Sequence, residues 1–132
     1  MEHLYFEKDK VQKESAFVIQ IENITSKESL LSEYAKKMRC SYFGKNWDAL
    51  YECISDFSWI PQNNIIIIHC PLADLKPDVR NVYIEIIVDA LIFNTNMMKE
   101  GKDVKNIDFV FDESDKDYIE NYVSSYRKRK HA

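Results

Sequence analysis

Glycine is scarce in this chain, which has only Gly44 and Gly101 among its 132 residues. Phosphate-cradling loops such as GxGxxG and GxxxxGK[ST] need glycines at a much closer spacing. The scarcity therefore excludes the glycine-rich loops with which nucleotide and dinucleotide enzymes hold their cofactors. Long apolar runs are missing as well, so no segment is expected to span a membrane.

Cysteine is also sparse, and the spacing of the cysteines does not indicate a disulfide framework. Cys40, Cys53 and Cys70 are odd in number and widely spaced, which fits reduced thiols. The first ten residues mix charges and lack the apolar core of a secretory signal. We therefore expect a cytoplasmic protein. No Cys or His pair has the spacing of zinc ligands, so neither a metal nor another cofactor is expected.

The charges of the chain are unevenly spread. Apolar residues make up 45% and charged residues 30%, which is ordinary for one globular domain. The net charge is −4, but a basic run occupies 127–130, and without it 22 acidic residues face 14 basic ones, a net charge of −8. An acidic body repels nucleic acid and attracts basic proteins. We expect a protein partner, and neither nucleic acid nor a membrane.

Strand and helix patterns alternate along the chain, which predicts an α/β domain with a small parallel sheet. Apolar, β-branched runs indicate strands at 17–21, 65–68 and 107–111, and 4–6 is a candidate edge strand. The continuous isoleucines at 65–68 are typical of a strand covered on both faces. We expect an N-terminal extension at 1–15, a main domain at 16–112, and a C-terminal helix with a basic tail at 113–132 packed on that domain.

Helical periodicity predicts four helices, each with a recognisable start or stop. The expected signals are a capping box of Thr25 and Glu28, an N-cap at Asn46, a first-turn Pro77 with a stop at Gly101, and a start at Ser114. The first helix should end near Cys40, and the second should extend to Phe57.

The second of these helices carries an acidic stripe. Asp48, Glu52 and Asp56 follow each other at i, i+4 and i+8, so they are expected on the side opposite the apolar residues. Like charges at this spacing cost a helix about 0.2–0.5 kcal/mol per pair, and no Lys or Arg lies between 46 and 58 to relieve them. The stripe is either a plain solvated face or a surface that a cationic partner covers.

Aromatic residues flank this stripe. Tyr42, Phe43 and Tyr51 lie beside the acids in the sequence, and aromatics next to charge are typical of tight protein interfaces. A structural alternative is partial burial of Phe43 and Tyr51 under the loop. With the aromatics, the pattern favours a binding surface.

The segment YFGKNWDALYECI, residues 42–54, resembles the barstar family of intracellular ribonuclease inhibitors. The family pattern is an aromatic pair, a glycine, a polar or acidic residue, an asparagine, an apolar residue, and then D-A-L-[WY]-[DE]. Here Tyr42 and Phe43 form the pair, Gly44 and Asn46 follow, and Asp48 and Glu52 are the two spaced acids. This order of residue types is hard to meet by chance.

The resemblance implies a three-stranded parallel sheet packed with helices, followed here by an extra C-terminal helix. It also implies that the second helix and the loop before it block the cationic active site of a ribonuclease. The partner-binding positions carried over or added by charge are Tyr42, Phe43, Gly44, Asn46, Asp48, Tyr51, Glu52, Asp56 and Glu100. The implied protein is an immunity or antitoxin-type inhibitor of a basic ribonuclease or nuclease toxin, and not an enzyme.

Several positions depart from the family pattern. Glu52 stands where an aspartate is usual, Lys45 where the best-known member has an acid, and Asp56 where that member has glycine. Glu100 is the one good candidate for the acids expected at the end of the third helix, because Asn96 occupies the other place. These differences point to a different cognate nuclease.

Two other functions compete with the inhibitor hypothesis. His69 and Cys70 follow a strand near Asp74, where α/β enzymes place active sites, but neighbours on a strand point to opposite faces, which argues against a Cys/His pair. The stronger alternative is a barstar-fold binding module for another basic toxin or a non-nuclease partner, because a fold does not fix a function.

Overall fold

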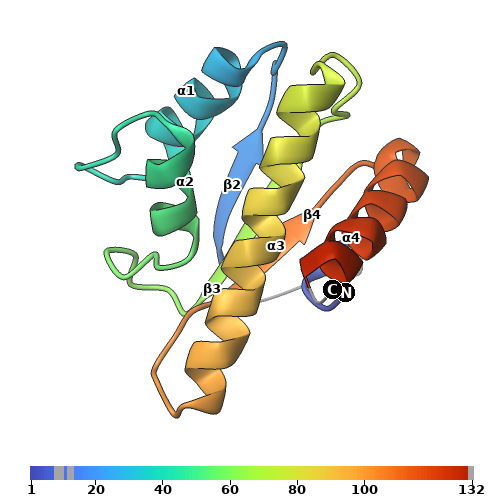
Figure 1. The fold of residues 1–132 in the computed structure, drawn as a ribbon. Coiled ribbons are helices and arrows are strands. Elements are labelled where there is room, and N and C mark those ends of the chain that lie inside the picture. The colour runs from blue at the N-terminus through green and yellow to red at the C-terminus, as the bar shows by residue number, and fades with distance from the viewer. Residues whose placement is uncertain (8–10, 12–13, 131–132) are drawn as a thin grey trace.

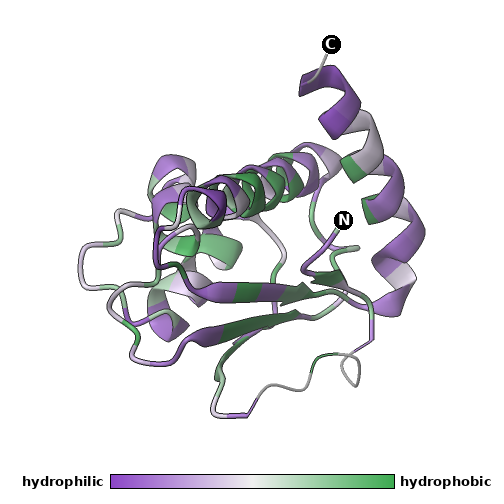
Figure 2. Cartoon of the chain, turned by 90° about the horizontal axis from the view of Figure 1, so that it is seen from below, coloured by the Kyte–Doolittle hydropathy of each residue, from purple (hydrophilic) through white to green (hydrophobic). Residues whose placement is uncertain are grey.

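The computed structural model describes residues 1–7, 11 and 14–130, and these form an α/β fold (Figure 1). The strands are β1 (Leu4–Tyr5), β2 (Phe17–Ile21), β3 (Asn64–His69) and β4 (Asn106–Val110). The helices are α1 (Lys27–Lys37), α2 (Trp47–Ile54), α3 (Pro77–Lys99) and α4 (Lys116–Lys130). Figure 2 shows the helices gathered on one face of the sheet.

The sheet is parallel throughout and has the strand order β1-β4-β3-β2. Ile67 of β3 lies opposite Ile19 of β2 and Phe109 of β4. The resemblance implied three strands, and the described residues form four, because β1 pairs with β4 at Leu4↔Phe109 and Tyr5↔Val110. This pairing confirms the candidate edge strand at 4–6, which the structure places at Leu4–Tyr5 on the edge of the sheet.

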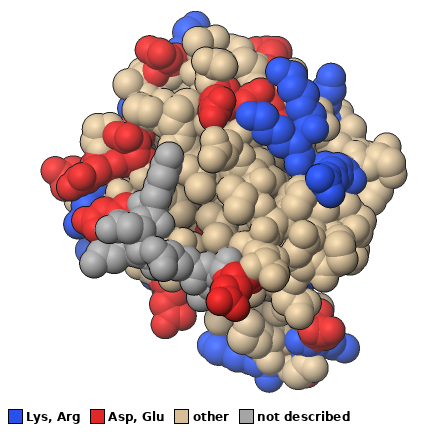
Figure 3. Space-filling model, turned by 180° about the vertical axis from the view of Figure 1, so that it is seen from behind, with Lys and Arg blue, Asp and Glu red and all other residues tan. Residues whose placement is uncertain are grey.

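The two faces of the sheet are buried by different parts of the chain. Alternate residues such as Ile19, Ile67 and Phe109 point into the main core under the helices, where each is at most 1% exposed. On the opposite face, Ile66 and Val110 form a small second cluster with Val11 of the N-terminal segment. The prediction that β3 is covered on both faces is confirmed. Figure 3 views the molecule from this side and shows a broad uncharged centre with charges at its borders.

The helix ends agree with the predictions in part. The capping box of α1 is formed by Ser26 and Ser29, one residue later than predicted: the Ser29 N–H donates to Ser26 Oγ (3.1 Å) and the Ser26 N–H to Ser29 Oγ (2.9 Å). Pro77 opens α3 as predicted, and Gly101 follows its end with φ 79°, the left-handed conformation that glycine adopts most readily. A 3₁₀ turn, Glu113–Asp115, precedes α4.

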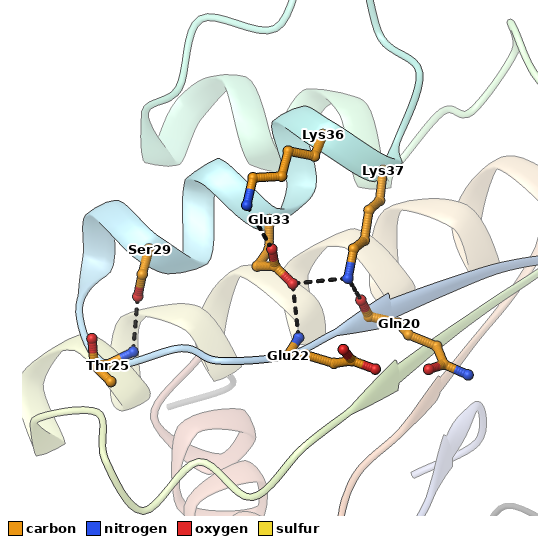
Figure 4. Close-up of polar contacts among 7 residues, drawn as sticks. All are labelled: Gln20, Glu22, Thr25, Ser29, Glu33, Lys36 and Lys37. Carbon is orange, nitrogen blue, oxygen red and sulfur yellow. Dashed lines mark hydrogen bonds and ion pairs between the residues drawn. The ribbon is translucent and has the colours of Figure 1, made fainter.

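A buried carboxylate ties α1 to the end of β2 (Figure 4). Glu33 accepts hydrogen bonds from the Glu22 N–H (3.0 Å) and from Lys37 Nζ (2.9 Å), and it pairs with Lys36 (3.3 Å). Lys37 Nζ also donates to the Gln20 carbonyl. Burial alone would raise the pKa of Glu33, but these hydrogen bonds outweigh it and lower the pKa below the usual value.

A row of tyrosines fixes α4 along α3. The three lie at i, i+4 and i+8 on α4, and their hydroxyls donate to three side chains with the same spacing on α3, in the pairs Tyr118–Asn81, Tyr122–Glu85 and Tyr126–Asp89. Ile119 and Val123 are buried beside them. The C-terminal helix α4 therefore packs against α3, which itself covers the sheet.

Candidate acidic binding surface

The loop before α2 sets the position of the helix through Asn46. Its Oδ1 accepts the Ala49 N–H at 2.8 Å, which is the N-cap predicted from the sequence. Gly44 contacts this cap closely, since a Cβ on Gly44 would lie 3.3 Å from Asn46 Nδ2. Lys45, between them, has φ 53°, a left-handed conformation that a non-glycine residue adopts at some cost. The cap and the turn together fix where α2 begins.

The two faces of α2 differ sharply in burial. Leu50 and Ile54 are fully buried against the core. Asp48 and Glu52 are exposed one turn apart, and no described residue donates a hydrogen bond to either carboxylate or forms an ion pair with it. Asp48 lies in the first turn, where the helix dipole stabilises an anion. Two carboxylates thus stand unpaired on a rigid, well-anchored helix.

Asp56 lies outside the helix. The structure ends α2 at Ile54, whereas the periodicity predicted a helix to Phe57. Phe57 has φ 53° and is nevertheless fully buried. Because it is apolar and buried, it continued the periodic pattern of α2 in the sequence although it lies outside the helix. Asp56 remains exposed beside the end of α2 and accepts a hydrogen bond from Ser58 Oγ (2.8 Å). The carboxylate is still close to the acidic face, but a turn holds it there.

An aromatic cluster supports the loop. Tyr42 is 62% exposed, and its ring meets the Trp59 ring edge to face at 5.6 Å. Trp59 Nε1 donates to the Met38 carbonyl (2.8 Å), which ties the cluster to the end of α1. Phe43 and Tyr51 are half-buried against the core. Desolvation, together with the neighbouring Cys40 and Cys53, raises the pKa of Tyr42 to about 12, so its hydroxyl is a neutral donor at physiological pH.

A groove of about 530 Å³ opens beside Glu52 and Asp56. Phe93 and Met97 of α3 line it, and Asp103 adds a further acid. Phe93 is 43% exposed, which is high for a large apolar side chain. Sequence reasoning missed these three residues, because they come from a segment more than 35 positions downstream and no local pattern marks them. Glu100, which was predicted, is exposed at the end of α3 and is not among the residues lining the groove.

Two thiols meet at the base of the loop. Cys40 Sγ and Cys53 Sγ are 3.3 Å apart, a contact that their spacing in the sequence did not predict. Cys40 is half-buried and Cys53, on the inner side of α2, is 1% exposed. Burial, followed by the contact with Cys40 and the nearby acids, raises the pKa of Cys53 to about 12. The thiol of Cys53 is therefore protonated at neutral pH.

His69, the centre of the enzyme alternative, belongs to the core. It is 4% exposed, its Nδ1 donates to the Val110 carbonyl (2.9 Å), and its Nε2 accepts from the Tyr83 hydroxyl (2.5 Å). Burial lowers the pKa of His69 to about 4, and the bond to Val110 only partly opposes this. Both ring nitrogens are occupied, so His69 has no free nitrogen to activate Cys70.

Two further kinds of site are absent from the described residues. Within 1–7, 11 and 14–130, no three His, Cys, Asp or Glu side chains gather as ligands for a metal ion. Among the helices described above, none combines the length and apolar character that a membrane span requires.

Comparison with known proteins points to one family. A search of proteins with curated functions gave no significant match. The family model of barstar, described as barnase inhibitor, matches residues 14–125, which covers the sheet from β2 onward, α1 to α3 and most of α4. This span exceeds the 16–112 range drawn from the sequence. Since the match covers most of the chain and the fold is the parallel α/β arrangement that the motif implied, this protein belongs to the barstar family.

Proposed function

We propose that this protein inhibits a ribonuclease by setting Asp48 and Glu52 against the cationic active site of the enzyme. The observation that carries the proposal is the pair of exposed, unpartnered carboxylates on α2, a helix whose start is capped by Asn46 and whose other face is buried. The family match supports an inhibitor of barnase-type ribonucleases.

The charge arrangement suits such a partner. A ribonuclease active site holds phosphate with basic side chains, so two carboxylates one helical turn apart stand where phosphates would bind. Because α2 is already ordered, little conformational entropy is lost on binding. Tyr42, exposed beside the acids, supplies aromatic contact area of the kind that anchors protein interfaces.

The groove beside Glu52 adds a recognition element for the partner. Its apolar residues Phe93 and Met97 suit the aliphatic stem of an arginine or lysine. Its three carboxylates outnumber the lysines Lys102 and Lys105 that also line it, and they suit the cationic head. A partner side chain that enters the groove would contact residues of α3 as well as α2. The groove therefore contributes to the choice of enzyme, along with the departures at Lys45, Glu52 and Asp56.

The test compares three baits in an extract of the source cells. These are the wild type, the double variant Asp48→Asn with Glu52→Gln, and the control Asp117→Asn with Glu120→Gln, which removes the same charge from exposed positions on α4. Captured protein is assayed for RNA hydrolysis with and without each bait. Removing one partner of a desolvated charge pair costs about 2–5 kcal/mol, so we expect inhibition at least roughly 100-fold weaker for the double variant only.

The opposing outcomes are equally definite. Equal inhibition by all three proteins would show that the carboxylates of α2 are not the site. Capture of a basic DNase or of a toxin without nuclease activity, dependent on Asp48 and Glu52, would keep the surface and replace the ribonuclease by that partner. A loss of thermal stability in the double variant would assign the acids a structural role.

A further inference from the structure

We propose that Cys40 and Cys53 form a disulfide when the protein meets a peroxide, and that this bond closes a ring around the acidic binding surface. The two sulfur atoms lie 3.3 Å apart in the reduced protein, while a disulfide bond is about 2.05 Å long. A shift on the order of 1 Å therefore joins them, which side-chain rotation and a small movement of the loop can supply.

The surroundings of the two thiols favour this reaction over oxidation of either one alone. Cys40 follows Arg39, whose φ of 57° turns the chain away from α1, and as a partly exposed residue Cys40 is the thiol of the pair that a small oxidant reaches first. Cys53 is buried directly behind it and is held in place by α2. A sulfenic acid formed on Cys40 thus has a resolving thiol in contact with it, which is the arrangement that protects a cysteine from further oxidation.

The reaction balances with one peroxide molecule for each disulfide. The Cys40 thiolate attacks a peroxide oxygen, the O–O bond breaks, and Cys40 becomes a sulfenic acid while hydroxide leaves and takes up a proton. Cys53 Sγ then attacks Cys40 Sγ, the S–O bond breaks, and water leaves with the thiol proton. Two thiols are oxidised to one disulfide and hydrogen peroxide is reduced to two water molecules.

The position of the bond gives it consequences for the binding surface. The ring closed by Cys40 and Cys53 encloses residues 41–52, which include every predicted partner-contacting position except Asp56 and Glu100. The disulfide would join the residue before the loop, Cys40, to Cys53 of α2. The loop at 42–46 and the exposed acids of α2 would then lie within one covalent ring. This consequence for inhibition rests on the proposed function, whereas the cross-link itself does not.

The experiment treats the purified, reduced protein with a small excess of hydrogen peroxide and maps its peptides by mass spectrometry without reduction. We expect a Cys40–Cys53 linked peptide pair, a mass loss of two hydrogen atoms, and Cys70 still free. The linked form should melt roughly 5 °C or more above the reduced form, because the ring restricts the unfolded chain. The control Cys70→Ser should form the same cross-link, and Cys40→Ser should form none.

Three results would overturn the proposal. One is oxidation of Cys40 to a sulfinic acid with no linked peptide. Another is a linked pair that includes Cys70. The third is a cross-link that persists in Cys40→Ser. Inhibition assays on the reduced and the oxidised protein form a separate readout: we expect both forms to inhibit, and a lack of inhibition by the reduced protein would count against the proposed function rather than against the disulfide.

Discussion

Asn46 is the residue on which the geometry of the acidic surface most directly depends. Its side chain caps α2, and it stands two positions before Asp48. Replacing Asn46 by alanine removes the hydrogen bond to the Ala49 N–H without touching either carboxylate. We expect the free energy of unfolding to fall by about 1 kcal/mol, measured by urea denaturation.

The matched control for that change is Asn46→Asp, which keeps an oxygen acceptor at the N-cap. This variant should retain the stability of the wild type within a few tenths of a kcal/mol. If Asn46→Ala and Asn46→Asp unfold at the same urea concentration, the cap does not hold the start of α2, and the rigid-helix argument loses its support.

The buried His69 makes the stability of the protein depend on pH. Its pKa is about 4 in the folded protein, against about 6.5 in an unfolded chain, so the unfolded state binds the proton first as the pH falls. The contribution of neutral His69 is fully present above about pH 6.5, and up to about 1.4 kcal/mol is lost per pH unit down to about pH 4.

The measurement is the free energy of unfolding from pH 8 to pH 4 for the wild type and for His69→Gln. Glutamine does not titrate, so its curve keeps only the acid-side loss from carboxylates such as Glu33, whose lowered pKa makes its contribution disappear below about 4.5. The difference between the two curves should stay constant above pH 7 and change by up to about 1.4 kcal/mol per pH unit between pH 6.5 and pH 4. Parallel curves would show that His69 is not held neutral.

Single residues also show where sequence reasoning succeeds and where it stops. The Asn46 cap was predictable because an N-cap is a local hydrogen bond between neighbours in the chain. Ser26 was missed in favour of Thr25 because both residues can cap, and only the exact turn of the chain selects between them. The contact between Cys40 and Cys53 depends on how the loop folds back, which no spacing rule records.

At the scale of elements, α4 is held by polar contacts as well as by burial. Tyr122 donates to Glu85 of α3 across the helix pair, and burial followed by that hydrogen bond raises the pKa of Tyr122. Tyr122→Phe removes only the hydroxyl and leaves the ring in place. We expect a loss of about 1–2 kcal/mol in the free energy of unfolding, because the acceptor is a charged group that is partly buried.

A double-mutant cycle separates this hydrogen bond from other effects of the change. Once Glu85 is replaced by alanine, Tyr122→Phe should cost much less than it does in the wild type, because the acceptor is already gone. Additive losses from Tyr122→Phe and Glu85→Ala would mean that the two side chains do not stabilise the protein as a pair.

The elements themselves were largely predictable, and their ends were not. The helices follow from periodicity, because a buried helix face imposes a spacing of 3.6 residues, and the strands follow from their apolar, β-branched runs. The end of α2 was placed too late because Phe57 is buried by a left-handed turn rather than by another helical turn. The groove could not be predicted, because Phe93 and Asp103 are distant from α2 in the sequence and lie beside it only in the folded chain.

At the scale of the whole molecule, the charges are separated. α2 with its acids and α4 with its basic end pack on opposite sides of α3 (Figure 1), so the basic run does not neutralise the acidic surface. Such a field steers a basic partner toward the acids and speeds encounter. We expect the association rate with the captured nuclease to fall roughly tenfold or more when salt rises from low to high ionic strength.

Stopped-flow kinetics at several salt concentrations would check this, with the Asp117→Asn, Glu120→Gln protein as the control. That control should keep the salt dependence of the wild type, and Asp48→Asn with Glu52→Gln should flatten it. A wild-type rate that does not change with salt would show that charge does not guide the encounter.

The pairing of β1 with β4 constrains the order in which the strands can join the sheet during synthesis of the chain. On the ribosome Leu4 is made before its partner Phe109, which is synthesised 105 residues later. During translation β2 and β3 can join while β1 still has no neighbour, since the strand beside it has not yet emerged. Although β1 precedes the other three strands in the sequence, it is therefore expected to be the last to enter the sheet, and until then the outer edge of β4 has no strand beside it.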